Sequence, residues 1–374
     1  MKENKARVIA FYLPQYHPIP ENDKYWGKGF TEWTNVAKAK PLFRGHYQPH
    51  IPADLGFYDL RLPEVREAQA ELARDAGIEG FCYYHYWFGN GKMLLQKPFE
   101  EVLRLGKPDF PFCLCWANHD WTTKTWVKGS SMVNNTMIAQ QEYLGEQDDI
   151  KHFEYCLRAF KDHRYITIEG KPIFLIYDPL SFPNVKEFMN RWNFLAKKNN
   201  LKGIYFIGVT TGRQSSYKIV TNLGFDGVCH NRRWEAEAKA AGFRFVRRMQ
   251  SLLGWHLGIS LMKYDYNKVV RNYDTPENKL ENCYPVITPG FDRTPRAGRR
   301  AGIYVNSSPK NFKKHVAEIC KSIQDKDDDH RLVFLSAWNE WGEGNYMEPD
   351  LKWGHGYLEA VSYTHLTLPT TERV

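Results

Sequence analysis

The chain has 374 residues, of which 43% are hydrophobic and 25% charged, the balance typical of a soluble globular protein. Its length fits one large α/β barrel or two smaller domains, and its aromatic content of 15%, with 12 tryptophans, is high. Lysine and arginine outnumber the acidic residues by 51 to 43, giving a net charge of +8. No motif for nucleic-acid recognition accompanies this charge, so nucleic acid is excluded as a partner. A weak association with an anionic membrane surface or an acidic glycan is favoured, although each basic cluster alone is typical of solvated surface.

Cysteine usage and the start of the chain bear on its cellular location. The seven cysteines form an odd set without CxxC spacing, and we predict that they are reduced core residues. The first residues, Met1 to Arg7, are polar, and neither a signal-peptide segment nor a long apolar stretch follows. These features predict a cytoplasmic protein without a transmembrane segment.

Short apolar runs recur along the chain and predict eight buried strands. The segments between them have the spacing of amphipathic helices, which favours right-handed β-α-β crossovers and a parallel sheet. Eight strands are the number that a closed barrel requires. The predicted strands are Val8–Leu13, Gly80–Tyr84, Phe112–Trp116, Ile173–Tyr177, Ile204–Val209, Gly227–His230, Pro285–Thr288 and Leu332–Ala337. The predicted helices are Leu62–Ala76, Phe99–Leu105, Ile150–Phe160, Val185–Lys198, Tyr217–Leu223 and Asn311–Ile323.

An open doubly wound sheet would also fit this alternation, but it normally binds a nucleotide through a glycine-rich first turn. Here Pro14–Pro18 follows the first strand and cannot form that turn. The expected fold is therefore α/β, a (β/α)8 TIM barrel with long β-α loops. We predict a single domain over residues 1–360, with insertions at 14–61 and 232–283. Residues 361–374 are similar to translated sequencing-adapter sequence, and we predict that they are a non-native tail that leaves the last barrel helix incomplete.

Aromatic and polar side chains collect where the first three predicted strands end. In a TIM barrel, the loops at the C-terminal ends of the strands carry the active site. We therefore predict that these side chains bind substrate. His85 and Asn118 are expected to form hydrogen bonds with sugar hydroxyls, and the tryptophans are expected to stack on sugar rings. The residues are Tyr16, His17, His85, Trp87, Trp116, Asn118 and Trp121.

The most informative segment follows the eighth predicted strand and carries Glu340 and Glu343 three residues apart. Chemistry at a glycosidic bond uses one carboxyl group to move a proton and a second to stabilise or attack the positive centre. An ordinary pair of solvated glutamates at a helix start is the alternative. The neighbouring Asn339 and Trp341 are poor choices for an exposed helix start, so we predict that Glu340 and Glu343 are catalytic and that Asn339 and Trp341 contact the substrate.

Taken together, the motifs resemble WbsX-like proteins, often labelled glycosyltransferases of surface-polysaccharide gene clusters, whose domain is similar to glycoside hydrolase family 99. The resemblance covers essentially residues 7–360 and rests on Ala10–His17, Gly29–Val36, Tyr83–Phe88, Trp116–Asn118 and Asn339–Gly344. It implies a (β/α)8 barrel with retaining endo-α-mannosidase chemistry that needs neither metal nor cofactor.

The resemblance also implies roles for the two carboxylates. Glu340 would act as base toward the sugar 2-hydroxyl and Glu343 as acid toward the leaving oxygen, through a 1,2-anhydro sugar. The spacing alone equally suits a direct nucleophile and an acid/base, because residues three apart on a helical turn have β-carbons about 5–6 Å apart. The absent signal peptide and the WbsX-type Phe30–Asn35 favour another bacterial surface glycan as substrate, including a lipid-diphosphate-linked form.

Two other functions stay open at this point. A glycosyltransferase would need an activated donor, usually held by an Asp-x-Asp element and a metal, and neither Asp265-Tyr266 nor Asp328-Asp329 provides that element. A non-catalytic glycan-binding protein would use the aromatic residues without turnover, and two neighbouring carboxylates have no purpose in such a protein.

Overall fold

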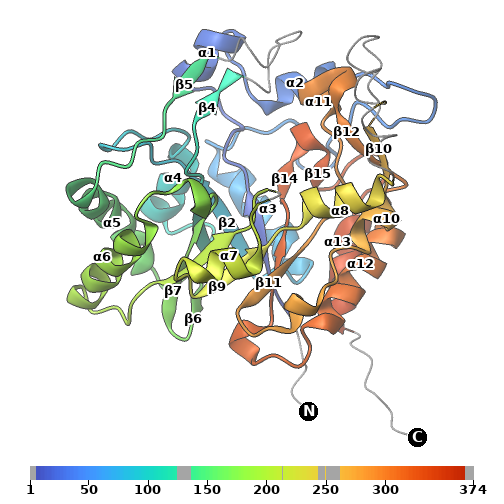
Figure 1. Cartoon of the computed structure of the whole chain (residues 1–374). Coiled ribbons are helices and arrows are strands. Elements are labelled where there is room, and N and C mark those ends of the chain that lie inside the picture. The colour runs from blue at the N-terminus through green and yellow to red at the C-terminus, as the bar shows by residue number, and fades with distance from the viewer. Residues whose placement is uncertain (1–5, 124–135, 213, 243–248, 250–261, 367–374) are drawn as a thin grey trace, which may run out of the picture.

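The computed structural model describes residues 6–123, 136–212, 214–242, 249 and 262–366. These residues form a closed barrel of eight parallel strands with helices around it (Figure 1). Around the barrel the strand order is β3-β2-β1-β13-β11-β9-β8-β7, and β7 pairs back onto β3. The barrel strands are β1 (Arg7–Tyr12), β2 (Gly80–His85), β3 (Phe112–Trp116), β7 (Lys171–Ile176), β8 (Tyr205–Val209), β9 (Gly227–His230), β11 (Cys283–Ile287) and β13 (Leu332–Leu335). All eight predicted strands are confirmed.

The barrel strands are apolar along nearly their whole length because both of their faces are covered. In β3 every residue is buried, and in β1 only Arg7 is not. The first and last strands of the barrel pair in parallel, with Val8 opposite Val333 and Ala10 opposite Leu335. This pairing closes the barrel between residues more than 300 positions apart in the sequence.

An outer layer of helices covers the strands. Its members are α3 (Pro63–Asp75), α4 (Lys97–Leu105), α5 (Glu146–Phe160), α6 (Val185–Lys198), α7 (Tyr217–Asn222), α12 (Pro309–Ser322) and α13 (Gly356–Leu366). Helix α12 begins where the Ser308 hydroxyl accepts the Asn311 amide and Pro309 occupies the first turn. Helix α13 packs against both α12 and α3, so it continues the outer layer between them. Its described part runs to Leu366, and the non-native origin of residues 361–374 stays a prediction.

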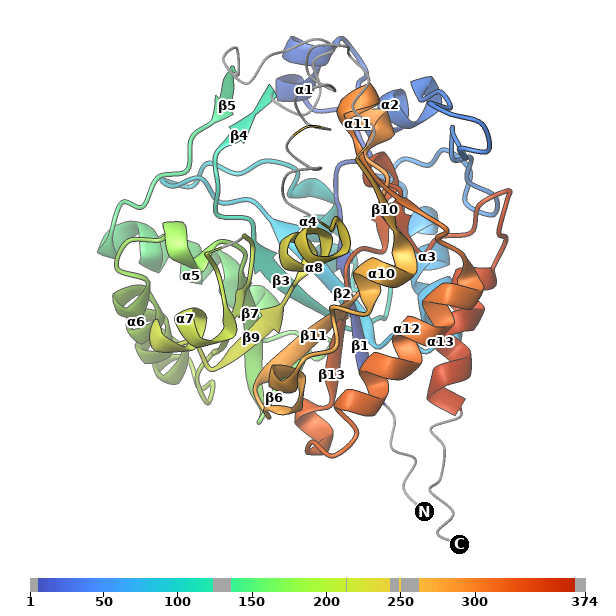
Figure 2. The same cartoon turned by 45° about the vertical axis from the view of Figure 1, so that its right-hand side comes forward.

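Three excursions rise above the C-terminal ends of the strands. The first carries α1 (Pro20–Trp26) and α2 (Glu32–Lys38), and the second carries α8 (Arg233–Ala240), β10 (Met262–Asp265) and α10 (Tyr266–Val270). A third, which the sequence did not predict, carries α11 (Thr294–Ala297) and β12 (Gly302–Val305) between β11 and α12. Strand β12 pairs in parallel with β10, and α11 packs on α2 at the same end of the barrel (Figure 2).

The smaller elements complete the described chain. They are β4 (Trp121–Thr122), β5 (Met137–Ala139), β6 (Thr167–Ile168), β14 (Asn339–Glu340), β15 (Asn345–Tyr346) and the 3-10 turns η2 (Pro179–Ser181), η3 (Pro276–Lys279), η4 (Gly298–Arg300), η5 (Asp328–His330) and η6 (Trp341–Glu343). All seven cysteines are buried and free, as predicted. Within the described ranges, the longest apolar helices fall short of what a membrane crossing requires.

Candidate active site

A tight hairpin after β13 holds the two glutamates. Strands β14 and β15 pair antiparallel around the 3-10 turn η6, so Glu340 ends one strand and Glu343 ends the turn. Side chains three residues apart eclipse each other in a 3-10 turn, which brings both carboxylates to one side. Gly344 follows with φ of +55°, and a β-carbon there would lie 2.8 Å from that of Asp292. The hairpin therefore needs glycine at this position.

One arginine from the third excursion binds both carboxylates. Arg296, on α11, places Nη2 2.9 Å from Glu340 Oε2 and Nη1 2.8 Å from Glu343 Oε1. The same Nη2 lies 2.5 Å from Glu32 Oε1 on α2. The Arg296 side chain is 8% exposed and that of Glu32 is fully buried, so solvent screens this network little.

Gly342 makes room for the Glu32–Arg296 pair. A β-carbon at Gly342 would collide with Glu32 Oε2 and would approach Arg296 Nε to 2.8 Å. Only glycine fits between the two glutamates, because the buried ion pair of Glu32 on α2 and Arg296 on α11 occupies the space that a side chain would need.

The surroundings push the pKa values of the two carboxyl groups in opposite directions. Burial, with the neighbouring Glu343 and Glu32, raises the pKa of Glu340 to about 8 against the opposing effect of Arg296. Burial would also raise the pKa of Glu343, but Arg296, Arg293 and Arg233 outweigh it and hold that pKa below its ordinary value. Arg293 Nε and Arg233 Nη1 lie 3.4 and 3.9 Å from the Glu343 carboxylate. The free protein therefore favours a proton on Glu340 and a charge on Glu343.

A cavity of about 220 Å³ opens over the pair, and four tyrosines are among the residues that line it. An adjoining cavity of about 270 Å³ shares four of its lining residues. The shared residues are His119, Tyr177, Asn231 and Arg233, and the first cavity adds Tyr84, Tyr86, Tyr273 and Phe291 beside Arg296, Glu340 and Glu343. Rings and hydroxyls of this kind provide both flat faces and hydrogen-bonding groups for a sugar.

Four of the predicted substrate-binding residues are buried and do not line the cavity. Asn339 is fully buried, and its amide group exchanges hydrogen bonds of 2.8 and 3.0 Å with the Leu13 backbone. Trp341 is also fully buried and donates its indole N–H to Glu348 at 2.6 Å. The Tyr16 hydroxyl donates to the Asn339 carbonyl, and His17 is buried with its pKa lowered to about 4 by burial. Asn339 and Tyr16 therefore attach the hairpin to the segment that follows β1.

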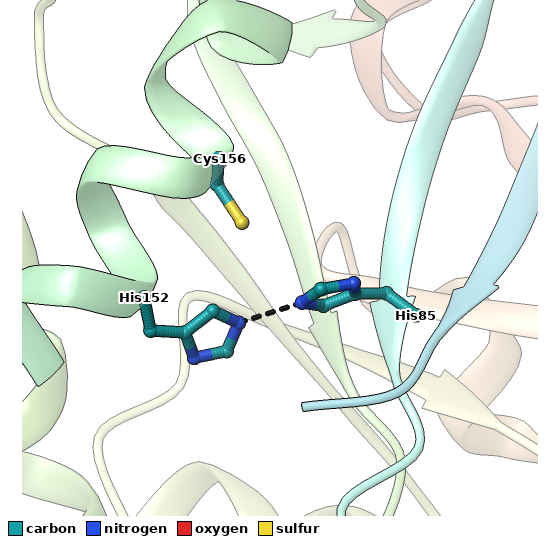
Figure 3. Close-up of side chains that lie close together, drawn as sticks. All are labelled: His85, His152 and Cys156. Carbon is teal, nitrogen blue, oxygen red and sulfur yellow. Dashed lines mark hydrogen bonds between the residues drawn. The ribbon is translucent and has the colours of Figure 1, made fainter. Parts of the chain in front are cut away.

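Residues from the second and third strand ends also differ from the prediction. His85, on β2, lies 2.8 Å from His152 of α5, Nε2 to Nε2, on the outer face of the barrel (Figure 3). Trp87 is buried and stacks on His152, with ring centroids 4.6 Å apart. Trp116 is buried too, and its indole donates to the Trp87 carbonyl. Successive side chains of a strand point to opposite faces, so the neighbours Tyr84 and Tyr86 line the cavity instead.

The remaining two predicted residues lie nearer the cavity. Asn118 is buried and joins the loops after β3 and β7, because its side chain exchanges hydrogen bonds with the backbone of Asp178. Trp121 is half-buried and stacks on Tyr86, with ring centroids 5.9 Å apart, next to the cavity wall. A ring-stacking role for Trp121 therefore stays a prediction.

His85, His152 and Cys156 are close enough to suggest a metal site, since their ligand atoms lie within 4.8 Å of one another. Two nitrogen ligands on one tetrahedral zinc ion are separated by about 3.3 Å. The observed separation of the two histidine nitrogens, 2.8 Å, is that of a hydrogen bond. Burial lowers the pKa of both histidines, so both rings are neutral and one donates its Nε2 proton to the other. The geometry is therefore that of a hydrogen-bonded pair and does not match a zinc site.

The match to a known family covers nearly the whole barrel. The family model described as Glycosyltransferase WbsX matches residues 8–361. This chain belongs to the WbsX glycosyltransferase family. Its sequence is 34% identical over 357 residues to the uncharacterized protein WxcX of Xanthomonas campestris pv. campestris, strains B100 and ATCC 33913 alike. The alignment covers 95% of this WbsX-family chain and 49% of WxcX, so the chain spans about half the length of these curated relatives.

Solved structures with the same architecture include glycoside hydrolases. The family 99 endo-α-mannosidase of Bacteroides thetaiotaomicron is 16% identical, with a TM-score of 0.56 and 96% of each chain covered. A glycoside hydrolase-like protein is 15% identical, with a TM-score of 0.58, 96% of this chain covered and 94% of that one. At these identities the likeness establishes the fold, the predicted (β/α)8 barrel. The match to the Glycosyltransferase WbsX family model makes this chain a member of an enzyme family.

Proposed function

We propose that this WbsX-family chain cleaves glycosidic bonds of a bacterial surface glycan with retention of configuration, using Glu340 and Glu343. The observation that carries the proposal is the pair of carboxylates on one arginine, with pKa values moved in opposite directions, in the lining of a cavity that also contains four tyrosines. Two carboxyl groups in different protonation states are what general acid and base catalysis at a glycosidic bond needs. The substrate is an oligo- or polysaccharide, including its lipid-diphosphate-linked precursor.

The electrostatics of the free protein favour Glu340 as the proton donor to the leaving oxygen. Glu343 faces three arginines and is the better candidate for the ionised partner, either as base or as nucleophile. The family resemblance implies the reverse division, with Glu343 as the acid. Aryl glycosides with acidic phenols separate the two, because such leaving groups need no protonation. The variant that lacks the acid retains activity on them, and the variant that lacks the base does not.

Replacing either carboxylate should abolish most turnover. For Glu340→Gln and Glu343→Gln we expect losses of about 10²–10⁴-fold in kcat on a cognate glycan, with the fold intact. Glu71→Gln on the exposed face of α3 is the matched control and should keep the parental rate. Normal turnover by either active-site variant would refute the assignment.

The family description favours one other reaction, glycosyl transfer. The arginines around Glu343, Arg233 and Arg293, provide positive charge at the cavity for a sugar diphosphate. Titration calorimetry with nucleoside-diphosphate sugars tests it. Binding that EDTA weakens, without cleavage of any polysaccharide, would replace hydrolysis by transfer.

A further inference from the structure

Besides the two adjoining cavities at the carboxylates, a larger one of about 320 Å³ lies on the other side of the catalytic hairpin. It is called the second cavity below. Gly344 and Tyr346 line this cavity, whereas Glu343 and Asn345 line the one that holds the carboxylates. Phe291 contributes to both. The two cavities are therefore separated only by the hairpin backbone and the segment that packs against it.

Aromatic rings and cations form the outer wall of this second cavity. Lys352 Nζ lies 4.6 Å from the ring centroids of both Tyr47 and Trp353, which holds the ammonium group at the wall. Arg44 is exposed and lies beside Phe43, another wall residue. Flat rings interleaved with cations suit a sugar that carries a negative charge.

Among the described lining residues, Asp292 is the one carboxylate, and its oxygens are already engaged. It accepts Gln48 Nε2 and His46 Nε2, each at 2.7 Å, and the Thr294 amide at 2.9 Å. The Leu42 amide donates to His46 Nδ1, so the His46 proton lies on Nε2 and points at Asp292. Asp292 thus keeps its negative charge at the wall but is held by neutral donors, and Arg44 and Lys352 provide the positive charges of the second cavity.

The catalytic cavity has the opposite character. Its arginines Arg296, Arg293 and Arg233 all lie within 4 Å of a glutamate carboxylate of the site. An anionic group entering there would compete with Glu340 and Glu343 for the same cations. An acidic sugar is accommodated more favourably behind the hairpin, where the carboxylate of the described lining, Asp292, is already bound by Gln48, His46 and the Thr294 amide.

We propose that the second cavity binds an acidic sugar residue of the same glycan that the catalytic cavity cleaves, so that the substrate class is an anionic polysaccharide. The proposal rests on the proposed function for its substrate. Arg44 and Lys352 bind the carboxylate or phosphate group, and Tyr47 and Trp353 contact the ring.

The test uses the full-length Glu343→Gln protein, so that binding is measured without turnover. Its affinity for a short oligogalacturonate is measured by titration calorimetry, with a malto-oligosaccharide of equal length as the neutral control. We expect saturable binding of the acidic oligomer, weaker binding of the neutral one, and about a tenfold loss of affinity when Arg44→Gln and Lys352→Gln are added. Lys161→Gln, an exposed site at the end of α5, is the matched control and should change nothing.

Three results would overturn the proposal: no saturable binding of oligogalacturonate, equal affinity for the neutral oligomer, or an equal loss with Lys161→Gln. None of them bears on catalysis, which is judged by the turnover of Glu340→Gln. Conversely, an active Glu340→Gln enzyme would refute the catalytic assignment while the binding measurement still decides whether the second cavity takes acidic sugars.

Discussion

At the scale of single residues, the protonation of Glu340 links the site to the stability of the fold. Its pKa rises from 4.5 to about 8 on folding, mainly through burial, so the folded state keeps a proton that the unfolded chain releases. The resulting stabilisation is fully present below about pH 4.5 and is lost as the pH rises through about 8. Glu348, with its pKa raised to about 7 by burial, acts in the same direction.

We therefore expect the free energy of unfolding to fall between about pH 5 and pH 8, and Glu340→Gln to make this fall shallower. Urea unfolding across that range measures both slopes. Glu71→Gln should leave the parental slope unchanged. An identical slope in parent and Glu340→Gln would mean that Glu340 is ionised in the folded protein throughout.

Gly342→Ala should damage both stability and activity. The added methyl group collides with Glu32 Oε2 and crowds Arg296, so the ion pair has to separate inside the protein. We expect a loss of about 1–3 kcal/mol in the free energy of unfolding, as in other overpacked sites, together with reduced kcat. Gly212→Ala, where a β-carbon would meet open space, is the control for thermal unfolding and turnover assays. Equal melting temperatures for the two variants would contradict the role given to Gly342.

At the scale of elements, the hairpin of β14 and β15 is attached to the barrel through Asn339. Asn339→Ala removes both side-chain hydrogen bonds to the Leu13 backbone and leaves buried polar groups unpaired. We expect a loss of roughly 1–3 kcal/mol in the free energy of unfolding and a fall in kcat greater than any change in KM. Asn272→Ala, two residues after the end of α10, removes one local hydrogen bond to the Lys268 carbonyl and serves as the control. An unchanged kcat in Asn339→Ala would show that the hairpin keeps its position without this attachment.

The elements also show what the sequence could and could not reveal. Continuous apolar runs marked the eight strands because both faces of each strand are buried. Which face of β2 points inward was not predictable, so His85 and Trp87 were assigned to the cavity that Tyr84 and Tyr86 line. The strand ends bear aromatic residues at consecutive positions, so composition could not separate the inner face from the outer one.

For the whole molecule, the sequence did not reveal which residues far apart in the chain form ion pairs in the site. Glu340 and Glu343 could be predicted as a pair because they are neighbours in the sequence, whereas Arg296 was visible only as part of a basic cluster. Its partner Glu32 is 264 positions away, and only the packing of α11 on α2 brings them together. The third excursion, which carries α11 and β12, has no distinctive sequence pattern. Its residues lie between a predicted strand and a predicted helix and were expected to form an ordinary loop.

The closure of the barrel by β1 and β13 has a consequence for how the protein is made. During synthesis β1 leaves the ribosome more than 300 residues before its partner, β13. Until then the nascent chain exposes two unpaired strand edges, on β1 and β11, and lacks the glutamates that follow β13. The barrel therefore closes in the same step that supplies the two glutamates, and a ribosome that stalls before Leu332 leaves an open barrel prone to aggregation.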